Sequence, residues 1–120
     1  MKLRCTELLS PTGKEIASSL WLKLGSEYTA LTLSVESTGN VMVRFIAEGG
    51  TEPTLFPLRQ FEIVDSSIPA TWVVWKGRKG GLNFGPQAWS ESGFWERYFD
   101  GDPSAVAAFE TERSKVLAAE

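Results

Sequence analysis

Residues 28–47, YTALTLSVESTGNVMVRFIA, hold the strongest structural signal in this chain. Two runs of alternating side chains flank a turn at Thr38-Gly39-Asn40, and both are rich in β-branched and aromatic residues, which favour strands. Alternation with a period of two places the apolar side chains of each run on one face of a sheet. Two such runs around a glycine-containing turn predict an antiparallel β-hairpin.

Three shorter segments downstream also have the composition of strands. Residues 59–64 alternate, which predicts that Phe61 and Ile63 point inward, and residues 82–84 form a short further strand. The segment 71–75 is apolar on both faces, which is typical of a strand that is central or covered by helices. Trp72 and Trp75 stand three positions apart in it, so we expect them on opposite faces.

Two interpretations remain open for residues 13–24, upstream of the hairpin. Thr12 and Glu15 have the spacing of a capping box, and Gly25 stands where a helix end favours glycine. One helical face would then carry five apolar residues, namely Ile16, Ala17, Leu20, Trp21 and Leu24. The sequence therefore predicts a helix over 13–24, with a strand at 20–24 as the alternative because leucines also alternate there.

The end of the chain predicts a helix over residues 103–118. Asp102 is a favourable N-cap residue and Pro103 suits the first helical position. A shorter helical turn is expected at 93–99. The predicted fold is α+β: an antiparallel β-meander of about five strands with an N-terminal helix and C-terminal helices packed on it, in one domain over residues 1–120.

The residue types available exclude several kinds of chemistry. The chain has no histidine and one cysteine, Cys5, so it lacks an imidazole-based catalytic pair and an ordinary zinc site. We therefore expect no catalysis, no metal and no cofactor. The net charge of −3 argues against nucleic acid as a partner. The acidity is concentrated in residues 86–120, which contain seven Asp/Glu and three Lys/Arg.

The sequence also bears on location. The first residues lack the long apolar region of a signal peptide, and no apolar run is long enough to cross a bilayer. A single cysteine fits a reducing compartment. We therefore expect a cytoplasmic protein that does not associate with membranes.

Aromatic and acidic side chains alternate in the stretch before the last helix. Exposed rings surrounded by acids are suited to bind a basic protein, and the candidate partner-binding residues are Glu91, Trp95, Glu96, Tyr98 and Asp100. The alternative is that the rings belong to a core beneath the helix. Glu96 and Asp100, four positions apart, are also the pair on which a carboxylate-dependent enzyme would rely.

The loop 76–81 is a second candidate site. It places Lys76, Arg78 and Lys79 among three glycines, so its backbone amides and cations are suited to bind an anionic ligand or nucleic acid, with Trp75 as a stacking surface. It matches neither the P-loop pattern nor the glycine pattern of dinucleotide-binding sites. The alternative is a hairpin turn with solvated charges.

Residues 93–102, GFWERYFDGD, followed by the last helix, carry a resemblance to a known group of proteins. With its small size, acidity and many tryptophans, the chain resembles the bacterial immunity proteins of contact-dependent or otherwise secreted toxin systems. The resemblance implies tight binding to a cognate toxin domain, often a basic one, whose active site or neighbouring surface is blocked. It transfers no residue role position by position.

Overall fold

The structure, a computed structural model, describes residues 1–118 of the 120-residue chain. The fold is α+β, and within those residues it has eight strands, two 3-10 turns and two helices. In chain order the elements are β1 (Lys2–Cys5), β2 (Glu27–Thr29), β3 (Thr32–Val35), β4 (Val41–Ile46), β5 (Pro53–Pro57), η1 (Leu58–Gln60), β6 (Phe61–Asp65), β7 (Trp72–Lys76), β8 (Leu82–Pro86), η2 (Gln87–Trp89), α1 (Phe94–Phe99) and α2 (Pro103–Ala118).

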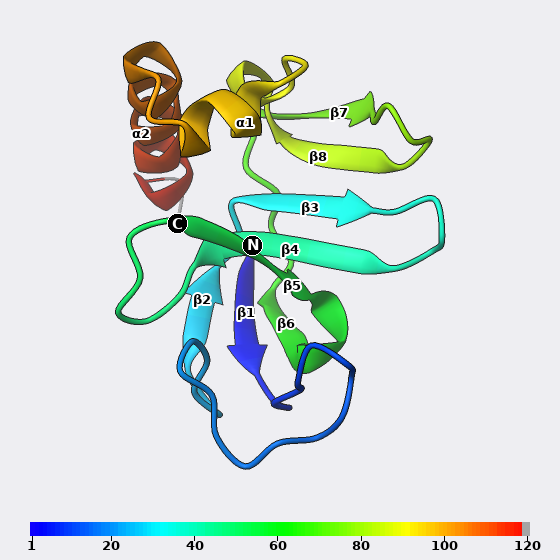
Figure 1. Ribbon diagram of the computed structural model, residues 1–120. Coiled ribbons are helices and arrows are strands. Elements are labelled where there is room, and N and C mark those ends of the chain that lie inside the picture. Colours follow the sequence, from blue (N-terminus) through cyan, green and yellow to red (C-terminus); the bar gives the residue numbers. More distant parts are fainter. Residues whose placement is uncertain (119–120) are drawn as a thin grey trace.

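The strands form two antiparallel sheets instead of the single five-stranded meander that the sequence predicted. The orders are β2-β1-β6 and β5-β4-β3-β8-β7. Figure 1 shows the three-stranded sheet below the five-stranded one, and α1 and α2 at the opposite end of the molecule. The chain changes sheets at Ala30-Leu31, through η1 and again between β6 and β7. The first change divides the strand predicted over 28–37 into β2 and β3.

The larger hydrophobic cluster, here called the sheet core, lies between the two sheets. The ring centroid of Phe45 lies 4.7 Å from that of Tyr28 and 4.8 Å from that of Phe56. Its buried members come from both sheets and from the loop after β1: Met1, Leu3, Cys5, Leu8, Leu22, Tyr28, Ala30, Val43, Phe45, Ala47, Phe56 and Phe61. Burial of this apolar surface is the main source of stability in the fold.

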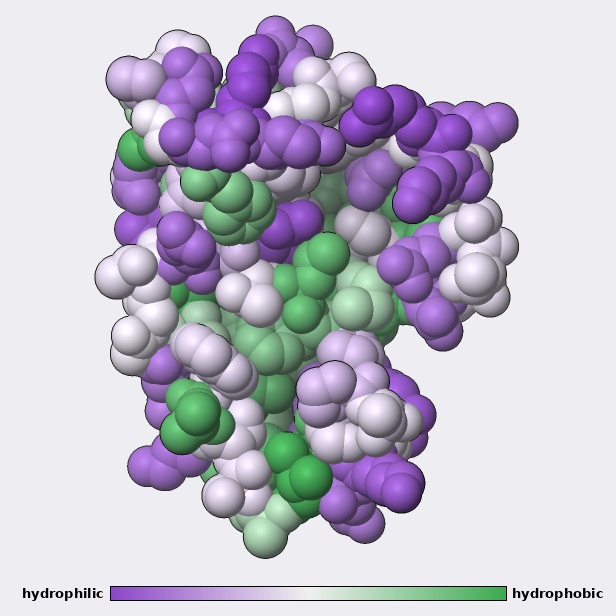
Figure 2. Space-filling view, in the orientation of Figure 1, coloured by the Kyte–Doolittle hydropathy of each residue, from purple (hydrophilic) through white to green (hydrophobic). Residues whose placement is uncertain are grey.

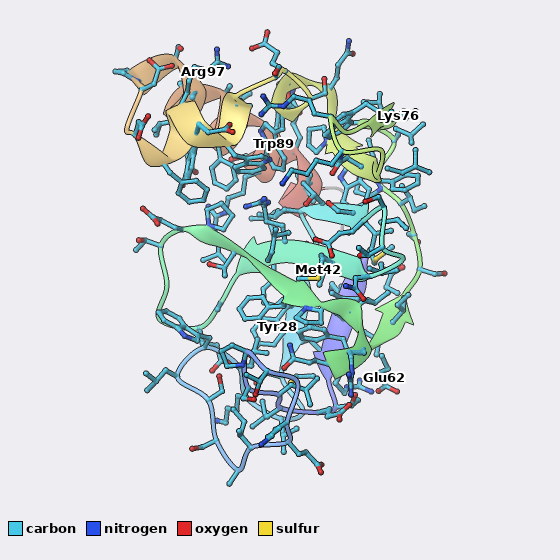
Figure 3. The ribbon with its side chains drawn as sticks, turned by 45° about the vertical axis from the view of Figure 1, so that its right-hand side comes forward. Tyr28, Met42, Glu62, Lys76, Trp89 and Arg97 are labelled. Carbon is cyan, nitrogen blue, oxygen red and sulfur yellow. The ribbon has the colours of Figure 1, made fainter. Side chains whose placement is uncertain are left out.

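A second cluster, the cap cluster, lies beneath the helices. Its buried members are Leu31, Trp89, Phe94, Ala105, Phe109 and Val116. The ring centroids of Trp89 and Phe109 are 5.1 Å apart. Figure 3 shows Trp89 and Tyr28 on opposite sides of β4, so the five-stranded sheet separates the two clusters.

Several predictions from the sequence are confirmed. The hairpin exists as β3 and β4, with Thr32 opposite Arg44 and Val35 opposite Val41. The last helix spans Pro103–Ala118 as predicted, with Phe109 and Val116 on its buried side. Within residues 1–118, neither helix combines the length and the apolar character that crossing a membrane requires.

Other strand predictions were wrong in part. β7 is an edge strand and not a central one, so Val73 and Val74 are exposed. In β6 Phe61 is buried as predicted, but Ile63, two positions along and on the same face of the strand, is 47% exposed. The sequence also missed β5, which begins and ends with proline; it lies at a sheet edge, where proline is tolerated.

The predicted N-terminal helix over 13–24 is absent, and so is its alternative, a strand at 20–24. The segment belongs to an irregular loop between β1 and β2. Ser19 Oγ accepts hydrogen bonds from the backbone N–H groups of Trp21 and Leu22, which forms a local turn in place of helical bonds. The propensity of serine for such turns therefore outweighed the helical spacing of the apolar residues.

Candidate functional site

The five-stranded sheet is covered unequally on its two faces. Val43 and Phe45 point into the sheet core, so Met42, Arg44 and Ile46 point to the opposite face. The helices cover that face only near Ile46, which packs against the cap cluster. The rest of the face forms a hollow of about 540 Å³, the Arg44 cavity, bounded by strands β3, β4, β5, β7 and β8, by their turns and by α1.

The floor of the Arg44 cavity is set by strand register. Met42, Ser34, Asn83 and Trp75 lie opposite one another across β4, β3, β8 and β7 and therefore share a face. Ser34 Oγ donates a hydrogen bond to Asn83 Oδ1 at 3.0 Å. The absence of a side chain at Gly85 makes room for the Trp75 ring, whose nearest carbon is 3.6 Å from where a Cβ would stand.

Arg44 is the unusual residue of this cavity. Its guanidinium carbon lies 3.9 Å from the centroid of the Trp95 ring, in a cation–π contact. Within residues 1–118 the guanidinium has no hydrogen bond and no ion pair. Burial lowers the pKa of Arg44 to about 10, so the side chain is still a cation at neutral pH, but one without a counter-charge.

The rim of the cavity carries two of the three cations that the sequence singled out. Arg78 and Lys79, in the turn between β7 and β8, line the cavity, and Arg78 forms an exposed ion pair with Glu96 at 3.4 Å. Lys76 alternates with Trp75 along β7 and lies on the other face of the sheet. Sequence reasoning missed Arg44, because an arginine between two inward residues of a strand is typical of a solvated face.

The five predicted partner-binding residues are divided between two environments. Glu91, Glu96 and Asp100 are exposed on or beside α1, and Glu91 pairs with Arg97 at 2.9 Å. The rings of Trp95 and Tyr98 turn inward instead. The Trp95 ring stacks on the Arg44 guanidinium, and the ring centroid of Tyr98 lies 4.8 Å from that of Phe109. Burial raises the pKa of Tyr98. The acids therefore form an outer surface, and the aromatic rings belong largely to the cap.

A second surface, the apolar loop, was not recognised as a surface from the sequence. Its large side chains are exposed: Leu20 at 90%, Trp21 at 56% and Leu24 at 55%. The sequence placed these residues on one helical face and so signalled their grouping, but it implied that the group would be buried.

A groove of about 610 Å³ lies between this loop and β5, where Phe56 and Pro57 form one wall. Met42 and Leu55 line both this groove and the Arg44 cavity, so the two hollows adjoin on one face. Figure 2 shows hydrophobic residues gathered over the middle and lower parts of the molecule, below a hydrophilic upper rim.

The remaining chemistry of the described residues is limited. Cys5 is buried, and burial raises the pKa of its thiol, which lowers its reactivity. Within residues 1–118, no three Cys, Asp or Glu side chains lie close enough together to hold a metal ion. Glu96 forms an exposed ion pair with Arg78, and Asp100 is exposed beyond the end of α1.

Known proteins give no further direction. Comparison of the chain with protein-family models, with curated proteins and with solved structures gave no match. The features of the molecule that bear on function are therefore its two hollows and the acidic side chains on and beside α1.

Proposed function

We propose that this chain is a non-catalytic, cytoplasmic protein-binding domain, and that it acts as an immunity protein that neutralises a cognate toxin. The observation that carries the proposal is the apolar loop, with Leu20, Trp21 and Leu24 exposed beside an apolar groove. Contiguous exposed apolar residues of this size are uncommon on proteins without partners and are typical of interaction sites. Tryptophan in particular is enriched among the residues that dominate binding energy.

The apolar loop is held in place before any partner arrives. The backbone N–H of Lys23 donates to Tyr28 Oη at 3.0 Å, and this hydroxyl in turn donates to Glu48 Oε1 at 3.3 Å. The Ser19 turn holds the backbone N–H groups of Trp21 and Leu22. A loop that is ordered in advance loses less conformational entropy on binding, which favours affinity.

The acidic surface on and beside α1 defines the chemistry of the partner. Glu91, Glu96 and Asp100 are exposed, and Asp100 has no ion pair within the described part of the chain. Such a surface attracts a basic protein and raises its rate of association. A basic toxin domain seated on the apolar loop and steered by these acids is the occupant that we propose.

The test is co-expression with the product of the adjacent gene, which the proposal expects to be a toxin, followed by size-exclusion chromatography and a cell-survival assay. The double variant Leu20→Ser with Trp21→Ser is expected to weaken the complex at least a hundredfold and to remove protection. Ile68→Ser is the matched control, since Ile68 is also exposed but lies outside the loop and its groove. Absence of both a complex and protection for the unaltered chain would refute the proposal.

The acidic surface is tested separately by Glu96→Gln combined with Asp100→Asn. Because these side chains are exposed, we expect a lower association rate at low salt and little change in the dissociation rate. An association rate that is unchanged at low salt would show that the partner is not selected by charge.

A further inference from the structure

The Arg44 cavity contains a charge that the protein itself does not neutralise. Arg44 is half-buried, and within residues 1–118 its guanidinium forms no hydrogen bond and no ion pair but lies over the Trp95 ring. Taking a cation out of water without a paired anion is unfavourable, and a cation–π contact offsets only part of that loss. A planar guanidinium presents paired N–H donors suited to a carboxylate or a phosphate, so the missing counter-charge is expected to be an anionic group with that geometry.

The surroundings of Arg44 define the rest of the ligand. Across the floor, Thr32 lies opposite Arg44 on β3, and next to it Gly85 on β8 lies under the edge of the Trp75 ring. Two strand spacings, about 10 Å, therefore separate the backbone at Arg44 from the Trp75 ring edge. That distance accommodates an anionic group at one end and a flat ring at the other.

We propose that the Arg44 cavity binds a small organic anion of nucleotide size, with its phosphate or carboxylate on the Arg44 guanidinium and its flat ring stacked on Trp75. The volume of about 540 Å³ is in the range of small-molecule sites. Lys79 and Arg78 at the rim add positive charge on the side of the β7–β8 turn. Asn83 on the floor has an amide nitrogen with no acceptor among residues 1–118, and so offers a further donor.

A small ligand fits this site better than a nucleic-acid strand. The cavity is bordered by Glu36 on one side and by Glu96, which pairs with Arg78, on the other. A chain of phosphates leaving the cavity would pass these carboxylates, and the net charge of −3 gives no basic track to follow. The site is separate from the apolar loop, so failure of one proposal leaves the other standing.

The test is isothermal titration of the full chain with two probes that share the ring-plus-anion chemistry, adenosine 5′-monophosphate and indole-3-acetate. Adenosine and indole, which lack the anionic group, are the matched uncharged probes. Arg44→Gln and Trp75→Leu are each expected to weaken binding at least tenfold, and Arg44→Lys, which keeps the charge but loses the planar donors, by less. Lys76→Gln is the matched protein control, because it removes one cation from the other face of the same strand.

Binding of either anionic probe, lost in Arg44→Gln and kept in Lys76→Gln, supports the proposal, and the probe that binds identifies the group as phosphate or carboxylate. Circular dichroism of each variant establishes that a loss is not due to unfolding. The proposal is overturned if neither probe binds at 10 mM, if the uncharged probes bind equally well, or if Lys76→Gln weakens binding as much as Arg44→Gln. Tighter binding of a single-stranded oligonucleotide than of the mononucleotide would also overturn it.

Discussion

The sheet core and the cap cluster bury aromatic rings in different ways. The sheet core is enclosed by strands on both sides, and its central ring, Phe45, contacts the rings of Tyr28, Phe56 and Phe61. The cap cluster is covered by helices on one side only. Its helix α2 contacts chiefly α1 and η2, and few strand residues. Trp95 contacts Phe109 of the cluster on one side, and its ring face meets Arg44 at the open cavity on the other.

This difference explains where the candidate sites lie. The helices are too short to cover the whole outer face of the five-stranded sheet, so Arg44 lies at the border between covered and open sheet. At the other end, the loop after β1 buries Leu8 and Leu22 in the sheet core but leaves Leu20 and Trp21 outside. Both candidate surfaces thus lie where one of the two clusters ends.

The largest effect is expected from Phe45→Ala. Removing a fully buried ring from an enclosed core leaves a cavity that rigid strands on both sides cannot fill, so the free energy of unfolding should fall by about 4 kcal/mol. Urea denaturation followed by circular dichroism measures the change. Phe99→Ala is the control, because Phe99 is 47% exposed, and it should cost less than about 1 kcal/mol. Equal losses in the two variants would contradict the central place given to Phe45.

Phe109→Ala should lower the free energy of unfolding by about 3 kcal/mol, less than Phe45→Ala does. The neighbouring rings of Trp95 and Tyr98 are only partly buried and have room to relax into the space left. Since α2 contacts few strand residues, the loss should also be local. Native-state hydrogen exchange should show reduced protection of amides in α1 and α2 and unchanged protection in β1 and β4. A uniform decrease across all elements would show that cap and sheets unfold as one unit.

The elements that sequence reasoning found are those determined by local signals. Strands β3 and β4 have alternation on both sides of a glycine turn, and α2 has a favourable N-cap followed by proline. The bounds predicted for β4 and α2 are close to those observed, whereas the strand predicted over 28–37 is longer than β3 and includes β2. The same reasoning did not establish β1, whose pairing partners are remote in sequence, or β5, which pairs with the neighbouring β4 but begins and ends with proline. β1 pairs with β2 and β6, far along the chain. Such pairing depends on tertiary contacts, which override short, weakly patterned segments.

The candidate site was predicted only in part, for a related reason. Arg78 and Lys79 were found because basic residues among glycines form a visible motif. Arg44 was missed because its environment is made by α1, 51 positions away at Trp95, and by strand order. Burial of a charge by a remote helix leaves no pattern in the neighbouring sequence. For Leu20, Trp21 and Leu24, by contrast, the sequence did show that they belong together, but it did not show that they are exposed.

Arg44→Met should change stability in the opposite direction to the core variants. Methionine has a similar length, suits the apolar neighbours Met42 and Leu55, and removes the unpaired charge, so the free energy of unfolding should rise by about 1 kcal/mol. Arg4→Met is the contrasting variant, because Arg4 forms ion pairs with Glu27 at 2.9 Å and Glu62 at 2.8 Å. It should leave stability unchanged or lower it by less than about 1 kcal/mol. A loss of stability in Arg44→Met would mean that the cation–π contact outweighs burial.

Leu20→Ser should have the smallest effect on folding. A leucine that is 90% exposed contributes almost no burial, so the free energy of unfolding should stay within about 0.5 kcal/mol of the original value. The variant distinguishes the observed loop from the helix that the sequence predicted over 13–24, because a helix packed through Leu20 would lose roughly 2 kcal/mol or more of unfolding free energy on the same change. Leu22→Ser is the internal control, because Leu22 lies two positions away and is buried in the sheet core. This substitution should lower the free energy of unfolding several times more than Leu20→Ser does. Similar losses at both positions would mean that the whole loop packs against the sheets, and the apolar loop would then have no surface to offer a partner.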